Sequence, residues 1–194
     1  MLVDQSPSTG SVSGSSWTNE TAGQNFADVF TLSGPTYLTA YNQFTNSYSS
    51  YANSTPGGFQ FKILADAGGK PGTLITDWDQ TYDSFTPIGN GLAEEHFTFA
   101  PTVLLGAGTY WIGVSGNGFD AGQAGVGGDP GGDNRMAQFN GGTFVYFTST
   151  YVGDQSYQLF GDPPGSVPEP VSLTLLGTIV AALGYRQWRT GRAG

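Results

Sequence analysis

Apolar and polar residues alternate in short runs along most of the chain. In the run 59–63, Phe59, Phe61 and Ile63 are apolar and the two residues between them are polar. A period of two places successive side chains on opposite faces of a β-strand. Runs of this kind, separated by Gly, Pro, Asn and Asp, predict nine strands: Asn25–Leu32, Tyr37–Phe44, Phe59–Asp66, Thr73–Tyr82, Glu95–Ala100, Gly108–Ser115, Met136–Asn140, Thr143–Thr148 and Ser156–Gly161.

No segment before residue 170 shows a helical period, so the sequence predicts an all-β body. About nine short strands with turn residues between them favour an antiparallel β-sandwich or jelly roll, and a barrel is the alternative. The predicted organisation has four parts: an N-terminal extended segment (1–24), the sandwich domain (25–161), a proline-rich linker (162–170) and a C-terminal transmembrane helix with a basic tail (171–194).

The C-terminal residues differ in pattern from the body. Residues 171–185 carry no charge, and Arg186, Arg189 and Arg192 follow them. A helix of this length rises about 22 Å, and extending it to Trp188 with snorkelling arginines gives a thin membrane span. The arginines would stay in the cytoplasm and the body outside. A buried helix of the fold is the alternative, although a surface helix should show a polar face.

A short motif precedes this apolar segment. Val167, Pro168, Glu169 and Pro170 end the linker, and the prolines hold the backbone extended. Over residues 167–192 this order of motif, apolar segment and arginines closely resembles the PEP-CTERM sorting signal of exopolysaccharide-producing Gram-negative bacteria. The arginines are interspersed here rather than in a tight run. The resemblance implies that an exosortase recognises the Pro-Glu-Pro motif and cleaves nearby, after which the body is released or re-anchored at the cell surface.

Residues 1–7 show neither the basic region nor the apolar region of a signal peptide. A sorting tail requires export, so we expect the true start to lie upstream of Met1. Localisation is then predicted in three stages: export, an inner-membrane intermediate held by residues 171–188, and the cell surface or extracellular matrix.

Composition narrows the partners. The net charge is −9, and 14 acidic residues face only three basic ones before residue 168. No cationic patch is present to neutralise phosphate, which excludes nucleic acid as a partner. The chain has no cysteine, so disulfides, thiolate metal sites and a cysteine nucleophile are also excluded.

Two candidate catalytic features are weak. His96 is the only histidine, and no Gly-x-Ser-x-Gly elbow accompanies it, so we interpret it as a surface residue at a strand edge. Asp77 and Asp79 flank Trp78, and on a strand both carboxyls would share one face at a distance that glycoside hydrolysis allows. Trp78 would then point to the opposite face. We therefore predict that the protein is not an enzyme.

Two binding features remain as candidates. Asp120, Asp129 and Asp133 lie in a glycine-rich stretch of the kind that offers oxygen ligands to calcium, but their spacing matches no known calcium loop. Apart from this calcium candidate, no cofactor is expected. Four tyrosines lie among Ser, Thr and Asn residues, where exposed rings can stack on sugars, or else pack half-buried at sheet edges. They are Tyr37, Tyr41, Tyr48 and Tyr51.

Two pieces of the body are similar to extracellular sandwich domains that carry varied surface-anchoring tails in bacteria. They are the glycine-proline turn at residues 66–74 and the run Gly108-Thr109-Tyr110-Trp111-Ile112-Gly113, which the resemblance places in the core. The function we predict is an exported, non-catalytic surface or matrix protein, sorted by an exosortase and associated with exopolysaccharide. A carbohydrate-binding module is the alternative.

Overall fold

The structure is a computed structural model that describes residues 1–7, 14–18, 24–46, 58–89, 91–118, 121–126, 135–140, 143–147 and 154–165. These residues form strands and no helix, which confirms the predicted all-β class. Within the same ranges no helix has the length and hydropathy that a membrane span needs. The predicted C-terminal helix lies outside the described residues.

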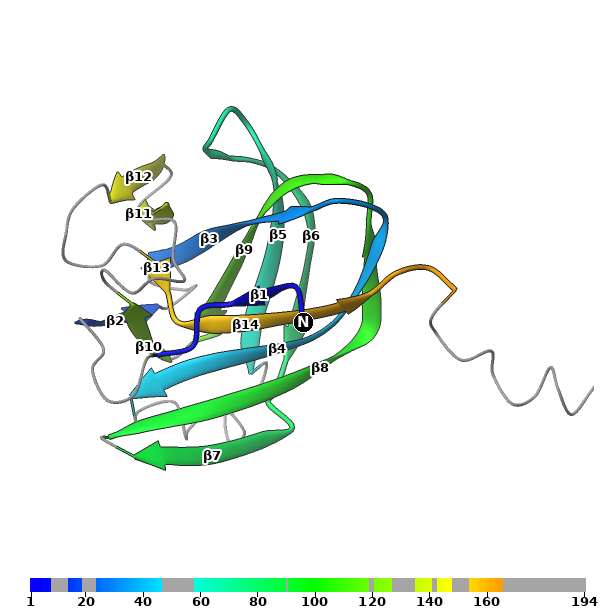
Figure 1. The fold of residues 1–194 in the computed structure, drawn as a ribbon. Helices are drawn as coiled ribbons and strands as arrows, with labels where there is room; N and C mark the ends of the chain where they lie inside the picture. Colours follow the sequence, from blue (N-terminus) through cyan, green and yellow to red (C-terminus); the bar gives the residue numbers. More distant parts are fainter. Residues whose placement is uncertain are drawn as a thin grey trace, which may run out of the picture.

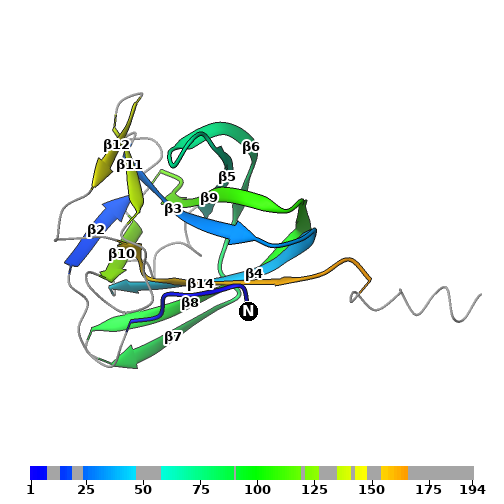
Figure 2. The ribbon, with the colours of Figure 1, turned by 45° about the horizontal axis from the view of Figure 1, so that its top comes forward.

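The strands form two main antiparallel sheets that lie one above the other as a sandwich, with a small third sheet at one end (Figures 1 and 2). The five-stranded sheet has the order β1 (Val3–Asp4), β14 (Tyr157–Asp162), β4 (Thr36–Asn46), β8 (Leu92–Leu105) and β7 (Ser84–Gly89). The six-stranded sheet has the order β12 (Thr143–Phe147), β11 (Met136–Asn140), β3 (Gln24–Leu32), β9 (Gly108–Gly116), β5 (Phe59–Asp66) and β6 (Pro71–Gln80). The three-stranded sheet contains β13 (Asp154–Gln155), β10 (Ala121–Val126) and β2 (Gly14–Thr18).

All nine predicted runs are strands in the structure. Five further strands, β1, β2, β7, β10 and β13, were not predicted. Two of them, β1 and β2, lie before residue 25, so the sandwich begins earlier than the predicted boundary. β1 belongs to the five-stranded sheet and pairs with β14.

Aromatic rings fill the space between the two main sheets. Phe59, Phe61 and Ile63 are fully buried, as their alternation predicts. The Phe61 ring stacks on Trp78 with centroids 5.2 Å apart and meets Phe97 edge-on at 5.0 Å. Each such pair contributes about 0.5–1.5 kcal/mol beyond the burial of its area. Ring packing therefore holds the two sheets at a fixed separation.

A second apolar cluster lies on the other face of the six-stranded sheet. It contains Trp111, which is fully buried although its neighbours in sequence point into the main core. The indole Nε1 donates a hydrogen bond to Asp66 Oδ1 at 2.9 Å. The other members of the cluster are Ala27, Val29, Leu64 and Ala137.

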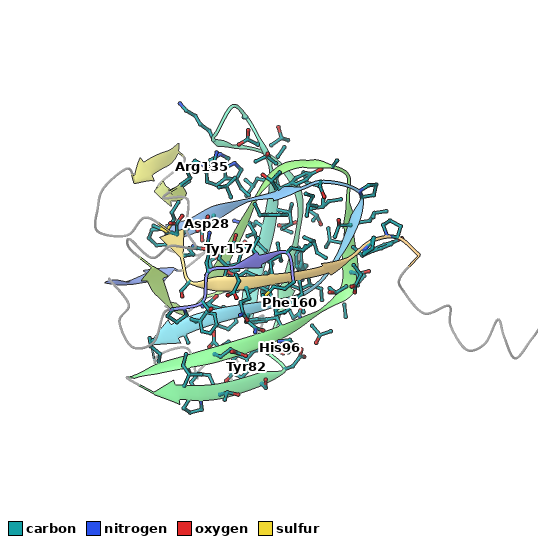
Figure 3. All side chains as sticks on the ribbon, viewed as in Figure 1. Asp28, Tyr82, His96, Arg135, Tyr157 and Phe160 are labelled. Atoms are coloured by element: carbon teal, nitrogen blue, oxygen red, sulfur yellow. The ribbon has the colours of Figure 1, made fainter. Side chains whose placement is uncertain are left out.

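A buried acid joins the main sheets to the third sheet. Asp28 is on β3, and its carboxylate accepts hydrogen bonds from the backbone N–H groups of Val29 and Gln155, both at 2.7 Å. Tyr157 lies beside it at the same end of the sandwich (Figure 3) and donates through its hydroxyl to Val29 O at 3.5 Å. Backbone donors thus satisfy a carboxylate that burial alone would penalise.

Candidate functional site

A row of polar side chains crosses the five-stranded sheet. Its register pairs Asp4 with Gln158, Gln158 with Asn42, Asn42 with His96 and His96 with Ser84, so one residue from each strand contributes. The next residues along three of these strands, Tyr41, Phe97 and Tyr157, are buried in the core. Since side chains alternate along a strand, the row lies on the outer face. We call Asp4, Gln158, Asn42, His96 and Ser84 the outer polar row.

Hydrogen bonds connect four members of the row and one neighbour. Asn42 Nδ2 donates to Gln158 Oε1 at 2.9 Å and to Glu94 Oε1 at 3.2 Å. Gln158 Nε2 donates onward to Asp4 Oδ1 at 3.1 Å. His96 Nδ1 lies 2.6 Å from Asn42 Oδ1. Asn42 is therefore the centre of the network, and it is only 7% exposed.

The network fixes the tautomer of His96. Asn42 Nδ2 lies between two acceptor oxygens, so the amide cannot be turned over without losing both bonds. Its Oδ1 must then face the imidazole. An amide oxygen only accepts, which puts the hydrogen on His96 Nδ1. His96 Nε2 lies 3.4 Å from Thr98 Oγ1.

Asp4 supplies a charge at one end of the row. The hydroxyl of Ser6, which donates to Asp4 Oδ1 at 2.7 Å, is the main cause that holds the pKa of Asp4 below its ordinary value. Burial opposes this effect and raises the pKa, while the Gln158 amide and the Ser6 backbone N–H each lower it by a smaller amount. Asp4 is therefore ionised at neutral pH.

Two half-buried aromatic residues share the outer face with the row: Phe160 lies beside it and Tyr37 lies farther along β4. Phe160 follows Gln158 by two residues on β14, so both side chains lie on the outer face; Figure 3 shows Phe160 and His96 on the same sheet. Tyr37 pairs with Leu104 and Asp162 beyond the bulges of β4. Its neighbour Leu38 is buried in the core, which directs Tyr37 outward. The outer face thus combines polar groups with ring surfaces.

The predicted tyrosines have different outcomes. Tyr37 is half-buried on the outer face. The prediction that Tyr41 contacts sugar is wrong, because its ring is 1% exposed and stacks on Tyr157 at 5.4 Å within the core. Burial also raises the pKa of Tyr41 well above its ordinary value. Tyr48 and Tyr51 lie outside the described residues.

The predicted acids of β6 are arranged as expected. Asp77 and Asp79 are exposed, and Trp78 between them packs against the core. Asp79 Oδ2 accepts a hydrogen bond from Asn117 Nδ2 at 3.1 Å. The interpretation of His96 as a strand-edge residue needs correction, because β8 lies between β4 and β7 and the ring is half-buried.

Three predicted sites lie outside the described residues. They are the calcium candidates Asp120, Asp129 and Asp133, the motif Val167, Pro168, Glu169 and Pro170, and the tail arginines Arg186, Arg189 and Arg192. In the part of the chain that the structure does describe, no three His, Asp or Glu side chains gather as metal ligands.

Sequence reasoning missed Asn42, Glu94, Gln158 and Asp4 as site residues. Each belongs to a polar position of a strand, which is the only local signal they carry. Their meeting depends on pairing between strands as much as 154 residues apart in the chain. That pairing cannot be read from alternation alone.

Comparison of the chain with protein-family models, with curated proteins and with solved structures finds no match. The outer polar row and the C-terminal residues are therefore the features from which a function can be inferred.

Proposed function

We propose that this is an exported, non-catalytic surface or matrix protein that binds polysaccharide through the outer face of its five-stranded sheet. Its C-terminal residues act as a PEP-CTERM-type sorting signal for an exosortase. In this proposal the β-sandwich body binds carbohydrate, and the C-terminal sorting signal brings the body to the cell surface.

The outer polar row is the observation that carries the binding proposal. Amide, carboxylate and imidazole groups at this site hydrogen-bond the hydroxyls of a sugar, while a ring such as Phe160 or Tyr37 packs against its apolar face. The groups are held in place by their bonds to Asn42, so little ordering is required when a ligand binds.

Binding fits this face better than catalysis does. Thr98, His96 and Asn42 form a relay of hydroxyl, imidazole and amide, as in nucleophilic hydrolases. Acyl transfer also requires backbone donors for the developing oxyanion. The N–H of Thr98, which stands beside the hydroxyl, instead donates to Asp83 Oδ2 at 2.6 Å. We therefore assign the relay to ligand contact and sheet stability.

The sorting proposal rests on the order of the C-terminal residues. A motif of Val167, Pro168, Glu169 and Pro170 precedes an uncharged segment and three arginines. β14 ends at Asp162, so six residues lead from the sandwich to the first proline of the motif. The apolar segment begins nine residues after Asp162, and nine fully extended residues span about 30 Å, so the proposed tail would keep the body near the membrane.

Affinity electrophoresis through gels that contain soluble polysaccharides tests the binding proposal. We expect at least one polysaccharide to retard the protein, and Gln158→Ala and Phe160→Ala to reduce the retardation. Asp77→Asn, on the opposite sheet, is the control and should behave as the unchanged protein. Absence of retardation across neutral, acidic and amino-sugar polymers would refute the proposal, as would an equal effect of Asp77→Asn.

A further inference from the structure

Charge is divided unequally between the two main sheets. The acids Asp4, Glu94 and Asp162 lie on the outer side of the five-stranded sheet, whereas Glu95 is buried on its core side. The described residues of this sheet include no Lys or Arg. The three basic residues that the structure describes belong to the other sheet: Lys62 is on β5, Lys70 precedes β6 and Arg135 precedes β11. The ligand-binding face is therefore anionic, and no described Lys or Arg on its own sheet offsets it.

The direction of the hydrogen bonds adds a second, independent constraint. Both hydrogens of the Asn42 amide are used, one by Gln158 of the row and one by the neighbouring Glu94. The carboxylates of Glu94 and Asp4 have no hydrogens to give, and each bonds within the network through a single oxygen. These carboxylates therefore offer acceptors that favour a ligand rich in donors.

The spacing of the two carboxylates sets the size of the ligand. Asp4 on β1 and Glu94 on β8 are separated by three strand-to-strand steps, through β14 and β4. Adjacent strands lie about 4.8 Å apart, so the backbones of β1 and β8 are about 14 Å apart across the sheet. The two carboxylates reach toward the Asn42 and Gln158 amides between them and are closer to each other than the backbones are. Several linked sugars are needed to reach both, with Phe160 beside their path.

On the premise of the proposed function, we infer that the polysaccharide is an amino-sugar polymer with free amino groups. Each ammonium group donates three hydrogens and carries a positive charge, which matches acceptors on an anionic face. An N-acetylated polymer keeps its hydroxyl donors and loses the charge. A polyuronate brings carboxylates toward Asp4 and Glu94 and is repelled.

Calorimetry on the full-length chain in detergent micelles tests this assignment with three probes: a glucosamine oligomer, the N-acetylglucosamine oligomer of equal length and a uronic acid oligomer. We expect the glucosamine oligomer to bind about tenfold or more tightly than its acetylated form. Salt at about 0.5 M should remove most of the difference. The uronic acid oligomer should not bind.

Two double variants that each remove two negative charges distinguish binding at the outer face from attraction caused by net charge alone. Asp4→Asn with Glu94→Gln removes two charges from the binding face but keeps an amide oxygen for the Asn42 and Gln158 donors. Asp77→Asn with Asp79→Asn removes two charges from β6 on the other sheet. We expect the first pair to abolish the preference for free amines and the second to preserve it, with thermal unfolding confirming that both fold.

Each outcome has a distinct meaning. Equal affinity for the free and acetylated oligomers overturns the amino-sugar assignment and leaves polysaccharide binding intact. Equal losses in the two double variants also overturn it, because attraction is then a matter of net charge. Failure of all three probes, together with no retardation in the polysaccharide gels, removes both the assignment and the proposed function.

Discussion

Asn42 is the residue on which the outer polar row depends, since it bonds Glu94, Gln158 and His96 at once. Replacing it by alanine leaves the partner groups unsatisfied at a buried position. We expect Asn42→Ala to lower the free energy of unfolding by about 1–3 kcal/mol, measured by urea denaturation. Ser84→Ala, at the exposed edge of the same row, should change it by less than about 0.5 kcal/mol. Equal effects of the two substitutions would contradict this role.

Asp66 should make stability depend on pH. The backbone N–H of Gly69 and then the Trp111 indole lower the pKa of Asp66 below its ordinary value. A lowered pKa in the folded state stabilises the fold above the unfolded value of about 3.9, and this contribution is lost as pH falls through the folded value. We therefore expect the free energy of unfolding to fall on acidification below about pH 4.

The measurement is urea denaturation at a series of pH values from about 3 to 7. This series covers the range of about 3 to 5 in which carboxyl groups titrate. Asp66→Asn should lower stability at neutral pH and flatten the decline at acid pH. Asp77→Asn removes a comparable charge from an exposed position of the same sheet and serves as the control. If the free energy of unfolding falls as steeply at acid pH in Asp66→Asn as in the unchanged protein, the Asp66 carboxylate does not cause the pH dependence.

The sequence predicted single residues well where burial follows alternation, and poorly where it depends on a second layer. Phe59, Phe61 and Ile63 are buried because their strand faces one core. Trp111 is buried on the opposite face, where a further cluster covers the sheet. Tyr41 stands in a polar run, yet it points into the core. Local composition did not show which face its strand presents.

Between β3 and β9 there is no room for a side chain at Gly113. A Cβ added at this glycine would lie 2.9 Å from the backbone oxygen of Phe26. Backbone on both sides cannot yield as a side chain does, so we expect Gly113→Ala to destabilise the protein by about 1–3 kcal/mol. Thermal unfolding followed by circular dichroism measures it.

Gly106→Ala is the matched control for this substitution. Its added Cβ would meet only the Tyr110 hydroxyl, at 3.9 Å, which is an ordinary contact. We expect little change in the unfolding temperature. A loss as large as that of Gly113→Ala would mean that the close approach of β3 and β9 is not the cause.

The nine predicted strands are all present, because alternation and turn residues mark a strand that is long enough to show a period. β1 and β13 have two residues each and show none. β7 contains Pro87, which lowers the strand signal and suits its place at the sheet edge. Strand order and register depend on long-range pairing and on bulges such as the one after Leu38, which alternation does not reveal. The outer polar row depends on that register and could not be predicted either.

For the whole molecule, the sorting proposal gives a direct test in an exopolysaccharide-producing Gram-negative host, with an export signal supplied upstream. We expect the unchanged protein to lose the residues after the motif and leave the inner membrane. Glu169→Ala should stay full-length in the membrane fraction, as measured by intact mass and fractionation. Asp162→Asn, in the last strand, is the control. Normal processing of Glu169→Ala would remove the motif from the proposal.

The place of β14 in the sheet has a consequence for when the body can fold. β14 is inserted between β1 and β4, and its Gln158 pairs with Asn42 across 116 residues of chain. Such a topology has high contact order, so we expect slow folding, on the scale of about milliseconds to seconds. A chain crossing a membrane from its N-terminal side delivers β14 after the other strands. Under the sorting proposal, the sheet is completed only when Val167, five residues after the end of β14, is itself about to emerge. The chain would then remain unfolded enough for transport until the proposed anchor follows.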